Sequence, residues 1–71
     1  MLLKCRDNFA RYTIQCPPGS QIKRNKEGRD LLFVPDPSEP DEPLILSDQI
    51  LIAVARESLF GVQLLSADPL N

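Results

Sequence analysis

The chain has 71 residues, of which 42% are hydrophobic and 25% charged, and its formal net charge is −2. This balance is too apolar for a disordered polyampholyte, while the longest apolar stretch, residues 50–55, is far short of the roughly 20 residues that span a bilayer. The chain has no histidine, which excludes Ser-His-Asp and Cys-His catalytic arrangements and the usual near-neutral general base. We therefore expect a soluble protein that is not an enzyme.

The small net charge hides a separation of opposite charges along the chain. Residues 1–34 carry seven Lys and Arg against three acids, a net charge of +4. Residues 35–71 carry one Arg against seven acids, a net charge of −6. Charges separated in this way are suited to steering association and selecting a partner.

A chain of this length is expected to form one small domain over residues 1–71. Such a domain buries only roughly 60% of its unfolded surface, and its single core supplies no more than about 3–5 kcal/mol. A protein partner, or self-association as a homodimer, would add the burial that the chain lacks. Because no long apolar run of a secretory signal follows residues 1–4, we expect a cytoplasmic protein with reduced thiols.

The first predicted hairpin joins strands over residues 2–5 and 10–16 through a turn at Asp7-Asn8. Polar and apolar residues alternate over residues 11–16, which is the period-two pattern of a half-buried strand. With Leu3 opposite Tyr12, one face of this hairpin carries Leu3, Cys5, Tyr12, Ile14 and Cys16. Both cysteines are then buried thiols, because this register does not favour the short Cα separation of a disulfide; a disulfide, a redox role or a metal role is the less favoured alternative.

Turn chemistry separates this hairpin from a second one. Pro18 and Gly19 suit the two central positions of a type II turn, because proline presets φ and glycine tolerates the positive φ that must follow. Strands over residues 20–25 and 29–34 then pair around residues 25–28, where Gly28 suits a left-handed position. Together the four strands are predicted to form an antiparallel meander or a small barrel.

Residues 35–43 are predicted to form a solvated linker. Four of these nine residues are prolines, and four are acids, namely Asp36, Glu39, Asp41 and Glu42. The prolines favour an extended polyproline conformation, and mutual repulsion of the acids keeps the segment hydrated. A hydrated connection is the favoured interpretation, and the alternatives are a ligand for a proline-binding groove or a tether whose acids shield the basic hairpin.

The most apolar part of the chain follows, and residues 48–60 are predicted to form a helix. Ser47 is a suitable N-cap and Gly61 a suitable stop, and the length and the alanines favour a helix over a central strand buried on both faces. The apolar residues leave no clean polar side, so we expect this helix to be buried nearly all round. Residues 62–65 are predicted to form a short strand and residues 66–71 a frayed tail.

These elements predict a small α+β fold, in which one C-terminal helix packs on an N-terminal antiparallel sheet of about four strands; an all-β small barrel is the alternative. No cofactor or metal is expected. Two cysteines are half of the ligands of a structural zinc site, so only a symmetric dimer that pools Cys5 and Cys16 would complete one. The three glycines are too dispersed for a phosphate-binding loop, and no small-molecule substrate is evident.

The favoured functional hypothesis is a non-catalytic protein–protein interaction module, either an accessory subunit or an inhibitor. Apolar residues of the predicted helix would supply affinity, and the charged segments would steer association; the apolar residues are Ile50, Leu51, Val54, Leu59 and Phe60. The alternative is a nucleic-acid-binding regulator that contacts phosphates through the tip of the second hairpin, namely Lys23, Arg24, Lys26 and Arg29, with Phe9, Tyr12 or Phe33 stacking on bases. An isoelectric point near 4.9 makes nucleic acid the weaker hypothesis.

Overall fold

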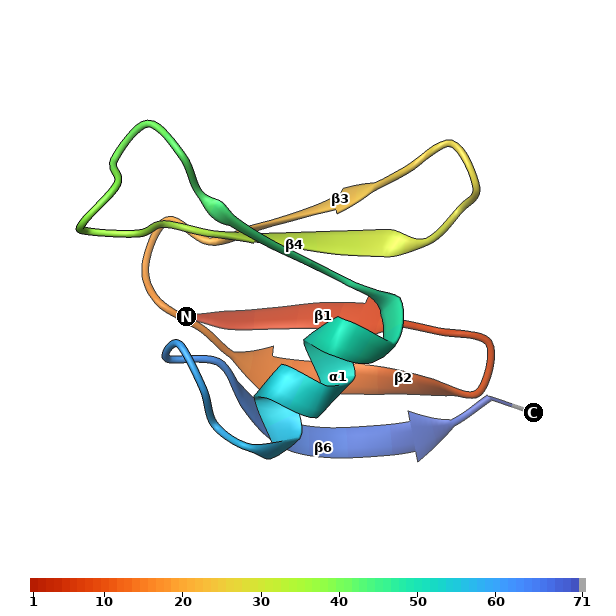
Figure 1. Cartoon of the computed structure of the whole chain (residues 1–71). Helices are drawn as coiled ribbons and strands as arrows, with labels where there is room; N and C mark the ends of the chain where they lie inside the picture. The colour runs from red at the N-terminus through yellow and green to blue at the C-terminus, as the bar shows by residue number, and fades with distance from the viewer. Residues whose placement is uncertain (71) are drawn as a thin grey trace.

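The computed structural model describes residues 1–70, except for the side chain of Asp48. Its elements follow the order β1 (Leu2–Arg6), β2 (Ala10–Gln15), β3 (Gln21–Arg24), β4 (Asp30–Val34), β5 (Leu44–Ser47), α1 (Asp48–Arg56) and β6 (Gln63–Pro69). The strands form two three-stranded antiparallel sheets, with the orders β1-β2-β6 and β3-β4-β5 (Figure 1). Within these residues no helix is both long enough and apolar enough to cross a membrane.

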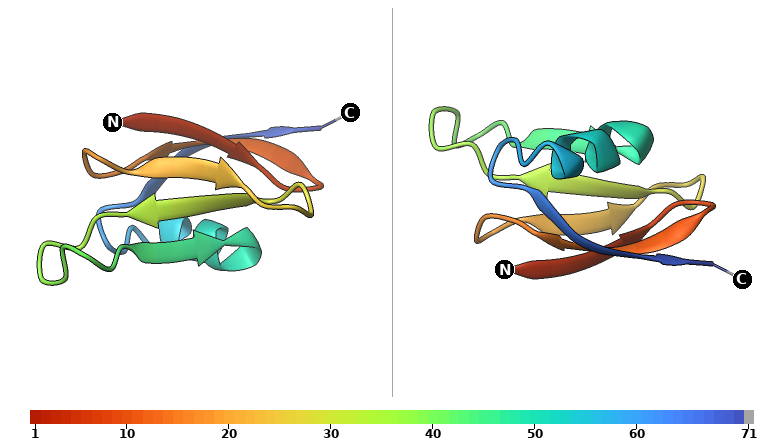
Figure 2. Two further views of the ribbon diagram at one scale, coloured as in Figure 1. Left: turned by 90° about the horizontal axis from the view of Figure 1, so that it is seen from above. Right: turned by 90° about the horizontal axis from the view of Figure 1, so that it is seen from below.

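The prediction of a single four-stranded sheet is wrong, because the two hairpins belong to different sheets. β6 adds to β2, and β5 adds to β4, so each hairpin gains its third strand from the C-terminal half of the chain. In both views of Figure 2, β5 and α1 lie at one side of the molecule and β1 at the other, with β3 and β4 between them. The prediction of an α+β fold is confirmed only as one helix with antiparallel sheets, and the described strands do not close into a barrel.

The first hairpin turns at the predicted residues, and the Asp7 side chain holds the turn. Asp7 Oδ1 accepts hydrogen bonds from the backbone N–H groups of Phe9 and Ala10 at 2.7 and 2.9 Å. Asp7 Oδ2 accepts a third from the Tyr12 hydroxyl at 2.7 Å. This is an Asx turn, in which a short side chain replaces the bonds of a regular backbone turn.

The predicted register of this hairpin is wrong by two residues. Cys5 pairs with Tyr12, and Leu3 pairs with Ile14. Because side chains alternate along a strand, a shift of two residues leaves every side chain on its predicted face. The predicted apolar face is therefore confirmed, and Cys5, Tyr12, Ile14 and Cys16 on it are all buried.

Both predicted turns of the second hairpin region are confirmed. The Ser20 N–H bonds to the Pro17 carbonyl at 3.2 Å, and Gly19 has a φ of 87°, as a type II turn requires. At the hairpin tip, the side chain of Asn25 accepts hydrogen bonds from two backbone N–H groups, and Gly28 takes the left-handed conformation with a φ of 81°.

The linker and β5 differ from the prediction. Two successive turns take the place of the predicted extended polyproline segment. In the first turn the Glu39 N–H donates a hydrogen bond to the Asp36 carbonyl at 3.1 Å, and in the second the Glu42 N–H donates one to the Glu39 carbonyl at 3.0 Å. Residues 44–47, for which the sequence predicted neither helix nor strand, form β5. Ser47 takes the predicted N-cap position, with extended backbone but without a side-chain capping bond.

α1 ends at residue 56, four residues before the predicted end. Ser58 adopts a left-handed φ of 57°, and its N–H bonds to the Ala55 carbonyl at 3.3 Å. The next N–H, that of Leu59, bonds to the Val54 carbonyl at 3.1 Å. These two bonds form a Schellman motif, so a serine rather than a glycine takes the left-handed position that ends the helix.

β6 extends through most of the segment predicted to fray, and residue 71 lies outside the described residues. Thr13 of β2 pairs with Ser66, while Ile14 pairs with Leu64, so Leu65 is an extra residue that forms a β-bulge. The residues of this strand have weak strand propensity after Leu65, and pairing with β2 overrides that preference.

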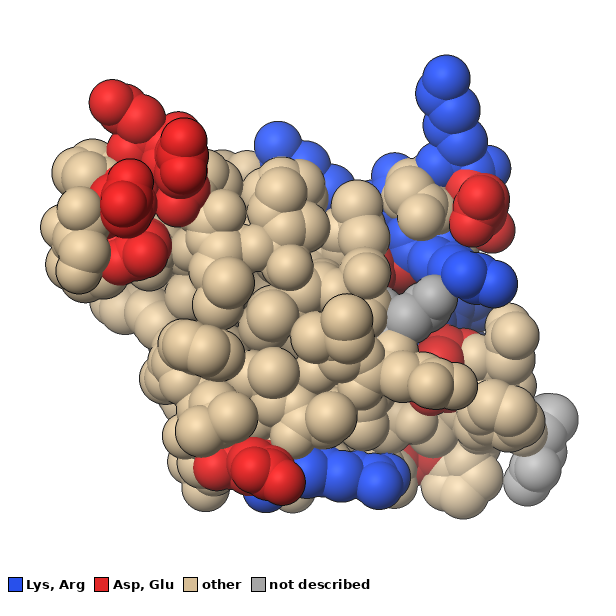
Figure 3. Space-filling view, viewed as in Figure 1, with Lys and Arg blue, Asp and Glu red and all other residues tan. Residues whose placement is uncertain are grey.

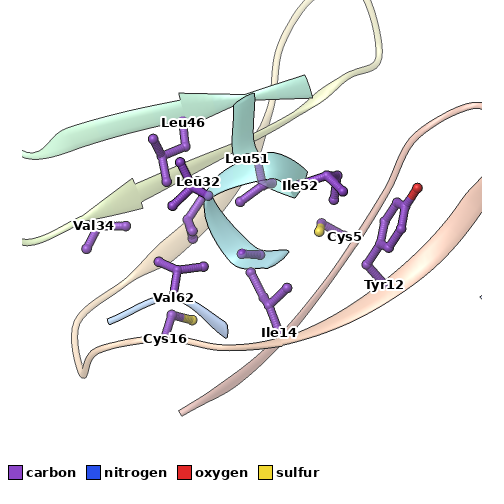
Figure 4. Packing of buried hydrophobic residues seen from close by; sticks show 12 residues of the cluster. Cys5, Tyr12, Ile14, Cys16, Leu32, Val34, Leu46, Leu51, Ile52 and Val62 are labelled. Atoms are coloured by element: carbon purple, nitrogen blue, oxygen red, sulfur yellow. The ribbon is translucent and has the colours of Figure 1, made fainter. Parts of the chain in front are cut away.

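One hydrophobic core lies between the two sheets and α1 (Figure 4). α1 contributes Leu51, Ile52, Val54 and Ala55 to this core. Ile50 and Ala53 of the same helix are exposed, so the prediction that the helix is buried nearly all round is wrong.

The side chain of Asp30 joins the two sheets. It is only 7% exposed, and its Oδ2 accepts a hydrogen bond from the backbone N–H of Arg6 in β1 at 3.0 Å. Its Oδ1 accepts one from Arg24 Nε in β3 at 3.3 Å. Because β1 and β3 are edge strands of different sheets, this carboxylate holds the two edges together.

Candidate protein-docking face

One face of the molecule, which we call the α1/β5 face, carries little charge. It is formed by β5, α1 and the loop that follows α1, and in Figure 3 the described residues there form a broad uncharged surface with charged side chains at its borders. Five exposed residues of these elements are apolar, namely Ile45, Ile50, Ala53, Leu59 and Phe60. Contiguous exposed apolar surface is more informative than single apolar residues, because it marks sites where another molecule binds.

The structure divides the five predicted docking residues into two groups. Ile50, Leu59 and Phe60 are exposed on the α1/β5 face. Leu51 and Val54 are buried in the core, because the helical period turns them toward the sheets. Three of the five predicted docking residues therefore remain candidates. Ile45, for which no docking role was predicted, is a fourth candidate because it is exposed.

Phe60 is held in an unfavourable backbone conformation although it is 60% exposed. The Val62 N–H bonds to the Leu59 carbonyl at 2.9 Å, and the two central residues of this turn, Phe60 and Gly61, have φ of 56° and 76°. Positive φ at both central positions is the pattern of a type I′ turn, which favours Asn, Asp or Gly at the place of Phe60. Strain at an exposed aromatic side chain is a reason to look for a function there.

Gly61, predicted to stop the helix, instead lets this turn approach the loop before β3. A Cβ at this position would lie 2.9 Å from Pro17 Cγ. Beside the contact lies an apolar hollow of about 460 Å³, lined by Pro17, Val34, Pro35, Asp36, Pro37, Leu44 and Phe60. Phe60 thus stands at the border between this hollow and the α1/β5 face.

The two charged segments lie at opposite ends of the α1/β5 face, as Figure 3 shows. At one end are the turns of residues 36–42, which we call the acidic turns. At the other end is the tip of the β3–β4 hairpin, residues 23–29, which we call the basic tip. The hypothesis that the acids shield the basic tip within one molecule is wrong, because the length of β4 separates them.

Several side chains of the basic tip have partners within the molecule. Arg24 bonds to Asp30, and Arg29 Nη1 lies 3.8 Å from Glu27 Oε2. Lys23 Nζ lies 4.9 Å from the centroid of the Phe33 ring, which covers the aromatic face predicted to stack on bases. Tyr12, the second predicted stacking residue, is buried in the core.

Further bases lie on the outer surface of the sheets, on the side away from the core. Because Cys5 and Tyr12 point into the core, the alternation of each strand turns Lys4, Arg6 and Arg11 outward. Phe9, at the tip of the first hairpin, is 77% exposed beside an open hollow of about 700 Å³ that Arg6 and Arg29 also line. Phe9 is therefore the one predicted stacking residue that is accessible.

The two cysteines are buried and unpaired with each other. Burial raises the pKa of the Cys5 thiol to about 11, and the nearby charges of Asp30 and Asp7 act in the same direction. Burial also raises the pKa of the Cys16 thiol. Since the thiolate is the reactive form, both side chains are poor nucleophiles at neutral pH.

Nowhere in residues 1–70, apart from the Asp48 side chain, do three or more His, Cys, Asp or Glu side chains gather to hold a metal ion. No protein-family model, curated protein or solved structure matches this chain. The α1/β5 face and its charged ends are therefore the features on which a functional proposal rests.

Proposed function

We propose that this protein is a non-catalytic interaction module that docks onto a protein surface through the α1/β5 face. The observation that carries the proposal is that β5, α1 and the loop after α1 expose Ile45, Ile50, Leu59 and Phe60, where Figure 3 shows a broad surface with few charged side chains among the described residues. Removal of such side chains from water contributes about 25 cal/mol per Å² of apolar surface, and affinity is what remains after the entropic cost of association. The core of the described residues contains twelve buried hydrophobic side chains, and a domain this small is stabilised if it buries further apolar surface against a partner.

The charged ends support the same proposal. Rim charges change the association rate and the choice of partner more than the final affinity. With acids at one end of the face and bases at the other, the field around it is that of a dipole rather than of a single charge. A partner with the reverse arrangement would be oriented before the apolar surfaces touch.

Site-specific photo-crosslinking tests this proposal. A photoreactive amino acid is placed at Ala53, on the α1/β5 face, and in a control variant at Gln15, which is exposed on the outer surface of β2. We expect protein adducts from position 53 that are absent from position 15 and that disappear when Ile50→Lys is added. Equal adducts from both positions, or none from position 53, would refute docking through this face.

A second candidate function, binding of single-stranded nucleic acid, is supported by the exposure of Phe9 beside Arg6 and Arg29. The side chain offers a stacking surface, and the outward bases of β1 and β2 lie near it. If four phosphates are contacted, log K should fall with log salt at a slope of about −2.8 for a single strand.

Fluorescence anisotropy with a labelled oligonucleotide tests the second candidate. Phe9→Ala should weaken binding by about 1–3 kcal/mol, the usual value of one stacked base. Lys23→Glu with Lys26→Glu reverses two charges of the basic tip and should weaken binding. These positions are chosen because neither substitution replaces Arg24 and its bond to buried Asp30. Absence of binding at low salt would exclude this candidate.

A further inference from the structure

We infer that the α1/β5 face binds a second copy of this chain, in a two-fold symmetric dimer that pairs β5 with β5 and brings the two α1 helices together. This inference rests on the proposed function and names its partner. It combines three observations: an open strand edge, the arrangement of charge around it, and a helix beside it that exposes apolar residues.

Of the four sheet edges in the described residues, β5 is the one without protection. The edges formed by β1 and β3 contact each other and are joined through Asp30. The edge formed by β6 carries the bulge at Leu65 and ends at Pro69, and both features discourage pairing with another strand. β5 has β4 on one side, no described strand on the other, and neither bulge nor proline.

Antiparallel pairing would also bury a side chain that the monomer leaves exposed. Ile45 is 55% exposed, and it lies on the face of its sheet opposite to buried Leu46. A two-fold pair centred on Ile45 places the two Ile45 side chains directly opposite each other, with Cβ atoms about 5 Å apart. This contact gives the exposed isoleucine an apolar neighbour of the same shape.

The charge arrangement selects the antiparallel orientation. β5 begins beside the acidic turns, where Leu44 pairs with Val34, and it ends toward the basic tip, where Ser47 pairs with Leu31. Because the partner strand runs in the opposite direction, the acidic turns of each copy lie toward the basic tip of the other. The contact occurs twice in the dimer, whereas a parallel arrangement would bring like charges together.

In this register only residues 44–46 of each β5 pair with each other, because Ser47 lies opposite Pro43. Three residues of backbone pairing are few for a dimer interface, so α1 must contribute. Ile50 and Ala53 are three residues apart and exposed, so they form a stripe on one side of the helix. α1 follows β5 directly and packs against it, so one interface can cover both the stripe and the β5 edge.

Analytical ultracentrifugation of the purified chain tests the strand pairing. We expect a concentration-dependent dimer whose dissociation constant rises at least about tenfold in Ile45→Lys, because a lysine on an edge strand opposes pairing. Leu65→Lys is the matched control, since Leu65 is 51% exposed on the bulged β6, and its dissociation constant should stay within about threefold of the wild type. Circular dichroism confirms that each variant is folded.

A charge swap tests the orientation. Variant A carries Glu39→Lys, Asp41→Lys and Glu42→Lys, and variant B carries Lys23→Glu and Lys26→Glu. Each variant alone opposes like charges at both ends of the interface, so its homodimer should weaken at least about tenfold in low salt. An equimolar mixture of A and B restores both attractive contacts, and native mass spectrometry should show the A·B heterodimer in excess.

The outcomes separate this inference from the proposed function. A wild-type chain that stays monomeric at about 0.1 mM, or a dimer that neither Ile45→Lys nor the charge swap affects, would overturn the inference. If the chain is monomeric but position 53 crosslinks to a different protein, docking through the α1/β5 face stands and only the identity of the partner is wrong. If position 53 gives no adduct to any protein, its own copy included, both fail.

Discussion

Replacing Asp30 by alanine should lower the free energy of unfolding by about 2–3 kcal/mol. The bond from the Arg6 N–H to the buried carboxylate is a charge-assisted bond, worth about 1.5–3 kcal/mol, and its loss leaves a backbone donor of an edge strand without its acceptor. The bond from Arg24 adds only about 0–1 kcal/mol, because the Arg24 side chain is 52% exposed. Since a core of this size supplies about 3–5 kcal/mol, the substitution removes a large part of the total stability.

Urea denaturation followed by circular dichroism measures this change, and two further variants separate its parts. Asp30→Asn keeps an oxygen acceptor for the Arg6 N–H and removes the charge, so it should cost about 1 kcal/mol. Arg24→Ala removes the exposed partner alone and should cost no more than about 1 kcal/mol. The reasoning is refuted if Asp30→Ala changes stability by less than about 0.5 kcal/mol, or if Arg24→Ala costs as much as Asp30→Ala.

Ser58→Gly should raise the free energy of unfolding by about 0.5–1 kcal/mol in the same assay, because glycine adopts the left-handed φ of the helix end without strain; a loss would contradict the Schellman assignment. At pH 8, Cys5 should react with a thiol reagent at least about 100-fold more slowly in the folded chain than in urea, since its pKa of about 11 lowers the thiolate fraction and burial limits access; equal rates would refute burial. Burial opposes ionisation of Asp7, but hydrogen bonds from Tyr12, Phe9 and Ala10 outweigh it and hold its pKa below 3.8. The stability that Asp7 contributes is thus present above pH 3.8 and lost as the pH falls below it, and Asp7→Asn should show a smaller loss of melting temperature on acidification than the wild type.

The two hairpin turns and the turn at Pro18-Gly19 were predicted well, because their chemistry is local. Asp7, Gly19 and Gly28 act through their own backbone or through residues two to four positions away, so the sequence around each one contains the reason for the turn. The alternation of residues 11–16 likewise identified the buried face of β2, and a register error of two residues did not change that face.

The candidate docking face was predicted only in part. Ile50, Leu59 and Phe60 are exposed as the docking hypothesis needs, whereas the neighbouring Leu51 and Val54 belong to the core. Hydrophobicity alone does not distinguish the two groups, because an apolar residue suits either the core or a docking surface. The direction in which α1 presents each side chain depends on where the sheets lie.

The sequence by itself determined several local features of this protein: the positions of its two hairpins and of the turn at Pro18-Gly19, the inward face of the first hairpin, and the separation of acids from bases along the chain. The tertiary structure decided which strands share a sheet, since β2 pairs with β6 about fifty residues later and no local preference encodes that partner. The tertiary structure also places β5 at an open sheet edge, with the acidic turns toward one end of this strand and the basic tip toward the other. The physical reason is that turn and strand preferences act within a few residues, whereas sheet order and surface exposure follow from contacts between distant segments that form only when the core is packed.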